Sequence, residues 1–206
     1  MDWLRDTVAA IFDEKASHYL RSPWDARNDY VAVLLKRTPE VIEDFLGRHA
    51  AKELTFEDKQ NLLTLLEMQR NAMLMYTSCG WFFDDIAGIE ALQILRYAAR
   101  VIQIAYSFDP TVINDFLKEL GEAQSNVKPN LHGDQIFDEK IRPQVACLAN
   151  VAAHVAISSV FEDVPAKARL YCYDVKLLDS IREESAERTL VVGRISVLSR
   201  ITTENR

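Results

Sequence analysis

Residues 56–77 read F-E-D-K-Q-N-L-L-T-L-L-E-M-Q-R-N-A-M-L-M-Y-T. Thr55 precedes them and Asp58 follows three positions later, a spacing typical of the capping box that begins a helix. The segment is apolar around most of its circumference, which is typical of a helix with neighbours on several sides. We therefore predict a central helix that begins after Thr55 and ends near Thr77.

Apolar residues at spacings of three and four predict further helices on both sides of this one. We expect them at about 2–20, 23–37, 39–49, 88–107, 111–123 and 134–162. Pro143 should kink the last of these or begin a new helix. The polar run S-N-V-K-P-N-L-H-G-D (125–134) predicts a loop. The fold class is therefore mainly α, a bundle of about six to eight helices.

The pattern changes after Pro165. Residues 168–182 and 189–202 are rich in β-branched and aromatic side chains with partial alternation, and E-E-S-A-E-R between them suits a turn. This predicts a small C-terminal β-hairpin. We expect a helical domain at 1–163 and a hairpin appendage at 164–206, the start of a β region that continues beyond this chain.

Composition excludes several classes of function. The chain has 206 residues and a net charge of −7, which argues against general affinity for nucleic acid or anionic membranes. Three widely separated cysteines and four scattered histidines lack the spacing of a zinc site or a disulfide framework. No apolar run is long enough to span a membrane. We expect a cytoplasmic protein without metal or cofactor.

The connection T-S-C-G-W-F-F-D-D-I-A-G-I-E (77–90) carries unusual chemistry for so short a segment. Trp81, Phe82 and Phe83 suit sugar binding, because a pyranose face is apolar and stacks on flat rings. They equally suit the core of a helix–helix corner, and general packing statistics favour that interpretation. Asp84 and Asp85 could divide acid and base roles, but capping of the next helix is favoured.

Polar side chains on the two central helices need partners if those helices are buried. Glu67, Asn71 and Ser78 recur at helical spacing on the first, with Arg70 beside them, and a buried charge network or a ligand groove would satisfy them. The second carries a polar stripe that suits an ordinary solvated face: Glu90, Gln93, Arg96, Arg100 and Gln103.

The run L-E-M-Q-R-N-A-M-L-M-Y-T-S-C-G-W-F-F-D-D-I-A-G-I-E-A-L-Q-I-L-R-Y-A-A-R (66–100) resembles a domain of unknown function numbered 3536, which follows the catalytic barrel in a branch of the glycoside hydrolase family 57 proteins. Segments 22–30, 151–162 and 169–173 agree, so the resemblance covers nearly the whole chain. Ala87 departs from it, since relatives often have serine there. Without that serine, Asp84 or Asp85 is the expected cap.

The resemblance implies a parent enzyme among the retaining α-glucan hydrolases and transferases, with a glutamate nucleophile and an aspartate acid on barrel strands. This chain shows no strand–helix alternation and therefore no barrel. It would be the helical region alone, inactive by itself, with no catalytic residue of its own. Such a region packs on the barrel and lines part of the glucan cleft.

The expected substrate-binding residues are Trp81, Phe83, Asp84, Asp85, Arg70 and Glu67. The expected partners are the protein's own N-terminal barrel and an α-glucan or other oligosaccharide. The alternative is a purely structural or oligomerisation module, in which Trp81, Phe82 and Phe83 are all deeply buried.

Overall fold

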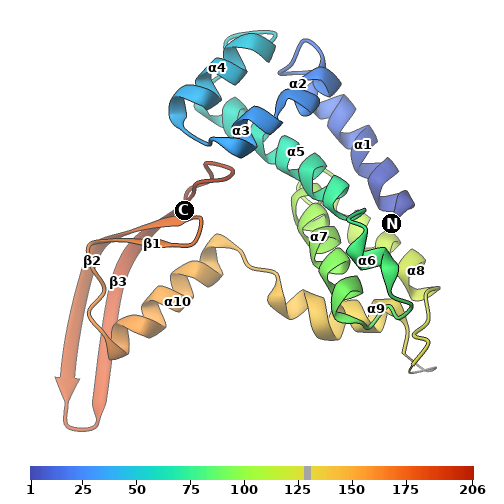
Figure 1. Ribbon diagram of the computed structural model, residues 1–206. Helices are drawn as coiled ribbons and strands as arrows, with labels where there is room; N and C mark the ends of the chain where they lie inside the picture. The colour runs from blue at the N-terminus through green and yellow to red at the C-terminus, as the bar shows by residue number, and fades with distance from the viewer. Residues whose placement is uncertain (128–130) are drawn as a thin grey trace. The chain divides into compact units, whose positions relative to one another are not determined.

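The computed structural model describes residues 1–127 and 131–206, and part of the expected loop at 125–134 therefore lies outside the described residues. The protein is mainly helical with a small antiparallel sheet near its C-terminus (Figure 1), as the sequence predicts. The described residues include ten α-helices, and all but the four-residue α6 and α9 are at least five residues long. The chain divides into two compact units, unit 1 (Met1–Val145) and unit 2 (Ala146–Arg206).

Unit 1 contains nine of these helices. They are α1 (Asp2–Ala16), α2 (Pro23–Asp29), α3 (Val31–Leu35), α4 (Pro39–His49), α5 (Phe56–Leu74), α6 (Cys79–Phe82), α7 (Ile89–Ala105), α8 (Val112–Gly121) and α9 (Gly133–Ile136). A π-helical turn (Phe137–Ile141) and a 3-10 turn (Arg142–Gln144) follow. The helix expected at 23–37 is interrupted at Tyr30, where α2 ends and α3 begins.

The central position predicted for 56–77 is confirmed by α5. It begins with the expected capping box, in which the Asp58 backbone N–H donates to Thr55 Oγ1 over 3.1 Å and the Thr55 N–H donates to Asp58 Oδ2 over 3.0 Å. From Leu65 to Gln69 every side chain is buried, so the helix has neighbours on all sides. It packs against α1 and α7 (Figure 1), whose buried faces supply most of the remaining core of unit 1.

Unit 2 consists of α10 (Leu148–Phe161) and a sheet of three strands, β1 (Lys167–Leu170), β2 (Tyr173–Ser185) and β3 (Arg188–Ser199), in the order β1-β2-β3. The sequence predicts one strand over 168–182, but Tyr171 has a positive φ of 53° and the chain reverses there. Two strands therefore form where one was expected.

A separate small core holds unit 2 together. Leu148 and Val155 of α10 pack with Val175 of β2 and Val197 of β3. The helix expected at 134–162 is broken in the region of Pro143, and its second part, α10, packs on the sheet. Along the chain, unit 1 ends at Val145 and unit 2 begins at Ala146, whereas the composition change in the sequence suggested a boundary at 163/164.

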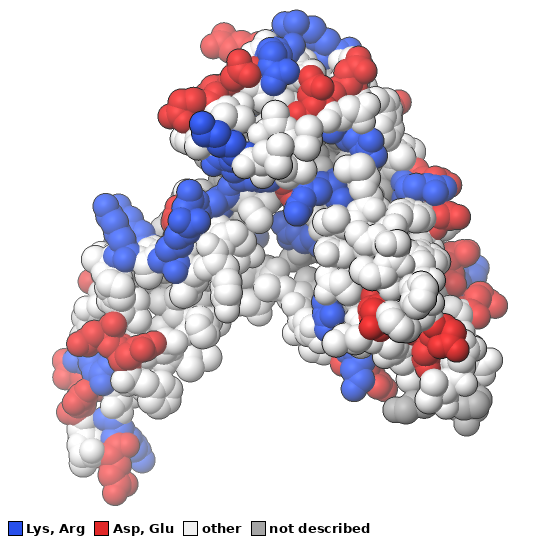
Figure 2. All heavy atoms as spheres, in the orientation of Figure 1, with Lys and Arg blue, Asp and Glu red and all other residues white. Residues whose placement is uncertain are grey.

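The far end of the β2–β3 hairpin is strongly charged. Side chains of both signs gather at the turn (Figure 2), where Ala186 and Glu187 connect the paired residues Ser185 and Arg188. No single helix in the described ranges is long and apolar enough to cross a membrane; the segments 133–144 and 148–161 reach that length and composition only when taken together.

Candidate functional site: an aromatic and acidic pocket

A pocket of about 520 Å³ lies in unit 1, at the connection between α5 and α7. Four of the six expected substrate-binding residues line it: Trp81, Phe83, Asp84 and Asp85. The other lining residues come from α1, α6, α7, α8 and their flanks: Met1, Asp2, Trp3, Gly80, Ile86, Ala91, Ile94, Leu95, Phe116, Glu119, Leu120 and Ala123. The sequence therefore predicts four of the residues that line the pocket, and the fold brings the others beside them.

Helix α6 is held close to α7 by Gly80. A Cβ atom at this position would overlap the side chain of Ile94, which is buried in the core of unit 1. Only glycine allows this approach without displacing the Ile94 side chain or one of the helices. The position of the next residue, Trp81, therefore depends on the missing side chain of Gly80.

Two contacts fix the orientation of Trp81, and two more hold its neighbour Tyr76 in place. Its indole N–H donates to the backbone carbonyl of Met75 over 2.8 Å, and its ring stacks on Tyr76 with centroids 6.1 Å apart and planes 8° from parallel. The Tyr76 hydroxyl donates to Asp2 Oδ1 over 2.5 Å, and the Arg5 guanidinium lies 5.5 Å from the Tyr76 ring centroid. The tryptophan is thus held in place while 56% of it remains exposed.

The exposure of the aromatic residues contradicts the core-filling interpretation. Phe82 is 82% exposed and Phe83 is 54% exposed, and their rings meet edge to face with centroids 5.2 Å apart. Large apolar side chains gathered at a surface pocket are typical of binding sites. The favoured sequence interpretation, a buried corner between two helices, is therefore wrong.

The two aspartates have different environments, and neither caps α7. The N-cap of α7 is Gly88, without a side-chain hydrogen bond, and Glu90 lies in the first turn as expected. Asp85 instead accepts hydrogen bonds from the Ala87 N–H (2.8 Å), the Ser125 hydroxyl (3.0 Å) and the Val127 N–H (3.2 Å). It ties the α6–α7 connection to the segment after α8.

Asp84 is held only through its backbone, whose carbonyl accepts a hydrogen bond from the Asn126 side chain. The Asp84 carboxylate is exposed and has no hydrogen bond or ion pair with any described residue. The same is true of Glu119 on α8. Among the described residues that line the pocket there is no lysine, arginine or histidine.

Asp2 is the fourth carboxylate at the pocket and is already paired. Asp2 Oδ1 accepts from the Tyr76 hydroxyl and also lies 3.2 Å from Arg5 Nη1. Burial and the hydrogen bond to Asp2 together raise the pKa of Tyr76 to about 12. The tyrosine therefore stays a neutral donor at ordinary pH and keeps the stack with Trp81 intact.

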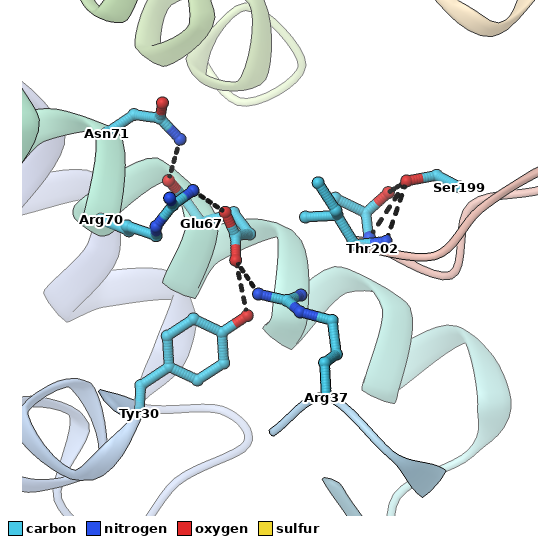
Figure 3. A network of polar contacts seen from close by, with 8 residues as sticks. Tyr30, Arg37, Glu67, Arg70, Asn71, Ser199 and Thr202 are labelled. Carbon is cyan, nitrogen blue, oxygen red and sulfur yellow. Dashed lines mark hydrogen bonds and ion pairs between the residues drawn. The ribbon is translucent and has the colours of Figure 1, made fainter. Parts of the chain in front are cut away.

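Glu67 and Arg70, the remaining expected site residues, lie in a different cluster (Figure 3) and do not line the pocket. Glu67 is only 2% exposed; its Oε1 accepts from the Tyr30 hydroxyl over 2.8 Å and from Arg37 Nη2 over 2.5 Å. Arg70 Nη1 donates to Oε2 over 3.2 Å, and the Asn71 side-chain amide donates to the Glu67 carbonyl over 2.8 Å.

This buried cluster joins α5 to the segment that contains α2 and α3. Burial and the adjacent Glu67 carboxylate raise the pKa of the Tyr30 hydroxyl, so that it remains a donor. Of the two interpretations drawn from the sequence, the buried charge network describes Glu67, since its carboxylate is fully occupied by protein donors. In Figure 3, Ser199 and Thr202 bond to each other within their own turn of unit 2.

Several residues of the pocket escaped prediction from the sequence. Asp2 and Trp3 precede Trp81 by almost eighty positions, and Glu119 follows it by almost forty. On their own helices each looks like an ordinary terminal or surface residue, and no local pattern singles them out. Within the described residues there is no group of three or more His, Cys, Asp or Glu side chains that could hold a metal ion.

The family model described as "Domain of unknown function (DUF3536)" matches residues 1–206, the whole chain. The chain belongs to this family. A protein named DNA replication and repair protein RecF, from Flavobacterium johnsoniae, is 24% identical over 163 residues, which cover 76% of this chain and 44% of that protein. The chain thus spans less than half the length of that relative. No solved structure matches it.

Proposed function

We propose that this DUF3536 chain is an accessory helical domain of a glycoside hydrolase family 57-like enzyme. In this proposal it packs on a catalytic barrel outside this chain and lines part of an α-glucan site. The observation that carries the proposal is the exposed, fixed ring of Trp81 at a pocket that also contains Phe83 and two aspartates.

The arrangement suits a saccharide for two reasons. A flat ring held at its edge and on one face offers the apolar surface on which a pyranose stacks. Carboxylate oxygens beside it accept hydrogen bonds from sugar hydroxyls, and no described residue occupies either carboxylate oxygen of Asp84. The pocket volume lies within the usual range for small-molecule sites.

The test is Trp81→Ala in the full-length protein, with Phe82→Ala as the matched control. Phe82 is an even more exposed aromatic on the same short helix, and it does not line the pocket. We expect Trp81→Ala to weaken malto-oligosaccharide affinity by roughly five-fold, equivalent to about 1 kcal/mol, and Phe82→Ala to leave it unchanged. If Trp81→Ala and Phe82→Ala have the same turnover and the same affinity, Trp81 is not part of the site.

A purely structural or oligomerisation role is the second candidate, and unit 2 carries the observation that favours it. Large apolar side chains are exposed along α10 and the hairpin: Ile157, Phe161, Ile181, Leu190 and Val192. Exposed apolar surface of this kind is common at protein–protein interfaces. Phe161→Asp in the full chain should then lower the molar mass of the assembly measured in solution. An unchanged molar mass would argue against self-association through this surface.

A further inference from the structure

We infer that the saccharide received by the pocket carries a protonated amino group. The ligand class is an amino sugar or an oligosaccharide that contains one, in preference to a neutral or anionic sugar. This inference rests on the proposed function in that the pocket receives a saccharide; it replaces the neutral α-glucan by an oligosaccharide that contains an amino sugar.

The first step is the charge of the pocket wall. Four carboxylates line it, from Asp2, Asp84, Asp85 and Glu119, and no basic side chain does so among the described residues. Concave walls of low dielectric concentrate such a field within the cavity. An anionic sugar, such as a phosphorylated or carboxylated one, would therefore be repelled.

The second step separates the carboxylates whose oxygens are already occupied by protein donors from those whose oxygens are not. Asp2 is paired with Arg5 and bonded to Tyr76, and Asp85 accepts three hydrogen bonds from its own unit. Asp84 and Glu119 have no partner among the described residues. Since no described side chain offsets these two charges, a cationic ligand gains more from this pocket than a neutral one does.

The third step is the aromatic surface. A ring face attracts a cation through its quadrupole, and tryptophan does so most strongly. In this protein Arg5 already uses Tyr76 in this way at 5.5 Å from the centroid, and Tyr76 in turn stacks on Trp81. Trp81 and Phe83 are exposed and line the same pocket as the Asp84 and Glu119 carboxylates. Such rings contact the sugar body and its ammonium group together.

The experiment compares four ligands on the full chain by calorimetry: the tri-glucosamine oligosaccharide with free amines, its N-acetylated counterpart, maltotriose and spermidine. We expect the free-amine trimer to bind roughly five-fold more tightly than the acetylated trimer at low salt. Because exposed charges are screened over about 3 Å at roughly 1 M salt, this preference should disappear there.

The variants Asp84→Asn and Glu119→Gln keep the shape of the pocket and remove one charge each. Each should lower the affinity for the free-amine trimer by about two- to five-fold, and by a larger factor than it lowers the affinity for maltotriose. Glu53→Gln is the matched control, since Glu53 is exposed in unit 1 and does not line the pocket. Circular dichroism of each variant verifies that it is folded.

The outcomes are distinguishable. Equal affinities for maltotriose and the free-amine trimer, both lost in Trp81→Ala, would overturn the inference and leave the proposed function intact. Spermidine that binds as tightly as the free-amine trimer, with Trp81→Ala without effect, would overturn both. The inference stands if the amine preference depends on Asp84 and Glu119 and saccharide binding depends on Trp81.

Discussion

Two carboxylates of unit 1, Glu67 within α5 and Asp84 after α6, show how similar residues acquire different roles. Glu67 is buried and receives donors from Tyr30, Arg37 and Arg70, so its charge is used entirely within the protein. Asp84 is exposed at the rim of a pocket and has no partner among the described residues. A carboxylate is available to a ligand when the fold leaves it unpaired, and sequence spacing does not reveal that.

The largest effect should come from removal of the buried carboxylate. Glu67→Ala leaves Tyr30 and Arg37 without their acceptor, which should lower the free energy of unfolding of unit 1 by about 3 kcal/mol. Tryptophan fluorescence during urea denaturation measures this, because all three tryptophans, Trp3, Trp24 and Trp81, belong to unit 1. Glu67→Gln keeps an acceptor and should cost less; a loss below about 1 kcal/mol in Glu67→Ala would contradict the account.

The next effect concerns the glycine that positions the pocket. Gly80→Ala places a methyl group against buried Ile94 and should cost about 1–3 kcal/mol, together with loss of saccharide binding as Trp81 moves. Gly47→Ala is the control, because a Cβ at this position on α4 meets nothing within 4 Å. That substitution should be neutral or stabilising by roughly 0.5–1 kcal/mol. Similar melting temperatures for the two variants would disprove the close approach of α6 and α7.

The neighbouring residues Asp85 and Asp84 allow the same comparison between a bonded and an exposed carboxylate. Asp85→Ala removes the acceptor for Ala87, Ser125 and Val127 and should destabilise unit 1 by about 1–2 kcal/mol. Asp84→Ala should change stability by less than about 0.5 kcal/mol, because its carboxylate has no hydrogen bond or ion pair with a described residue. Urea midpoints of the two variants test this directly. The reverse order would mean that Asp84 is the structural residue of the pair.

The smallest expected effect concerns the titration of the Tyr76 hydroxyl. The pKa of Tyr76 is raised to about 12 in the folded protein, above the value near 10 of an unfolded chain. The stabilisation from this group is therefore fully present below about pH 10 and is lost as the pH rises toward 12. Asp2→Asn should move the Tyr76 titration to lower pH, as measured by tyrosinate absorbance with Tyr76→Phe as the blank. A titration unchanged by Asp2→Asn would contradict the short hydrogen bond.

The parts of the fold that depend on local chemistry could be predicted from the sequence. The capping box at Thr55 and the apolar pattern after it predict α5 and its central position, since both signals lie within a few turns. The interruption at Tyr30 and the reversal at Tyr171 could not be predicted. The first carries no proline or glycine signal, and the second places a tyrosine where glycine is usual.

The candidate site divides in the same way. Its aromatic and acidic composition could be predicted from residues 77–90, and the roles of the two aspartates could not. Asp85 is satisfied by Ser125, forty positions away, and therefore does not act as the helix cap that its spacing suggests. The exposure of Trp81 likewise depends on Tyr76, Asp2 and the approach allowed by Gly80.

The β2–β3 hairpin has a consequence for local opening. β1 pairs only with Tyr173–Lys176, and α10 supports the ribbon as far as Arg182, which donates a hydrogen bond to the Ser159 carbonyl. Nearer the turn the ribbon has two strands alone. Such ribbons are marginally stable in water. Amide hydrogens near Ala186 should therefore exchange with solvent long before those near Val197, and the protection measured along the hairpin should rise steadily from the turn toward the three-stranded end.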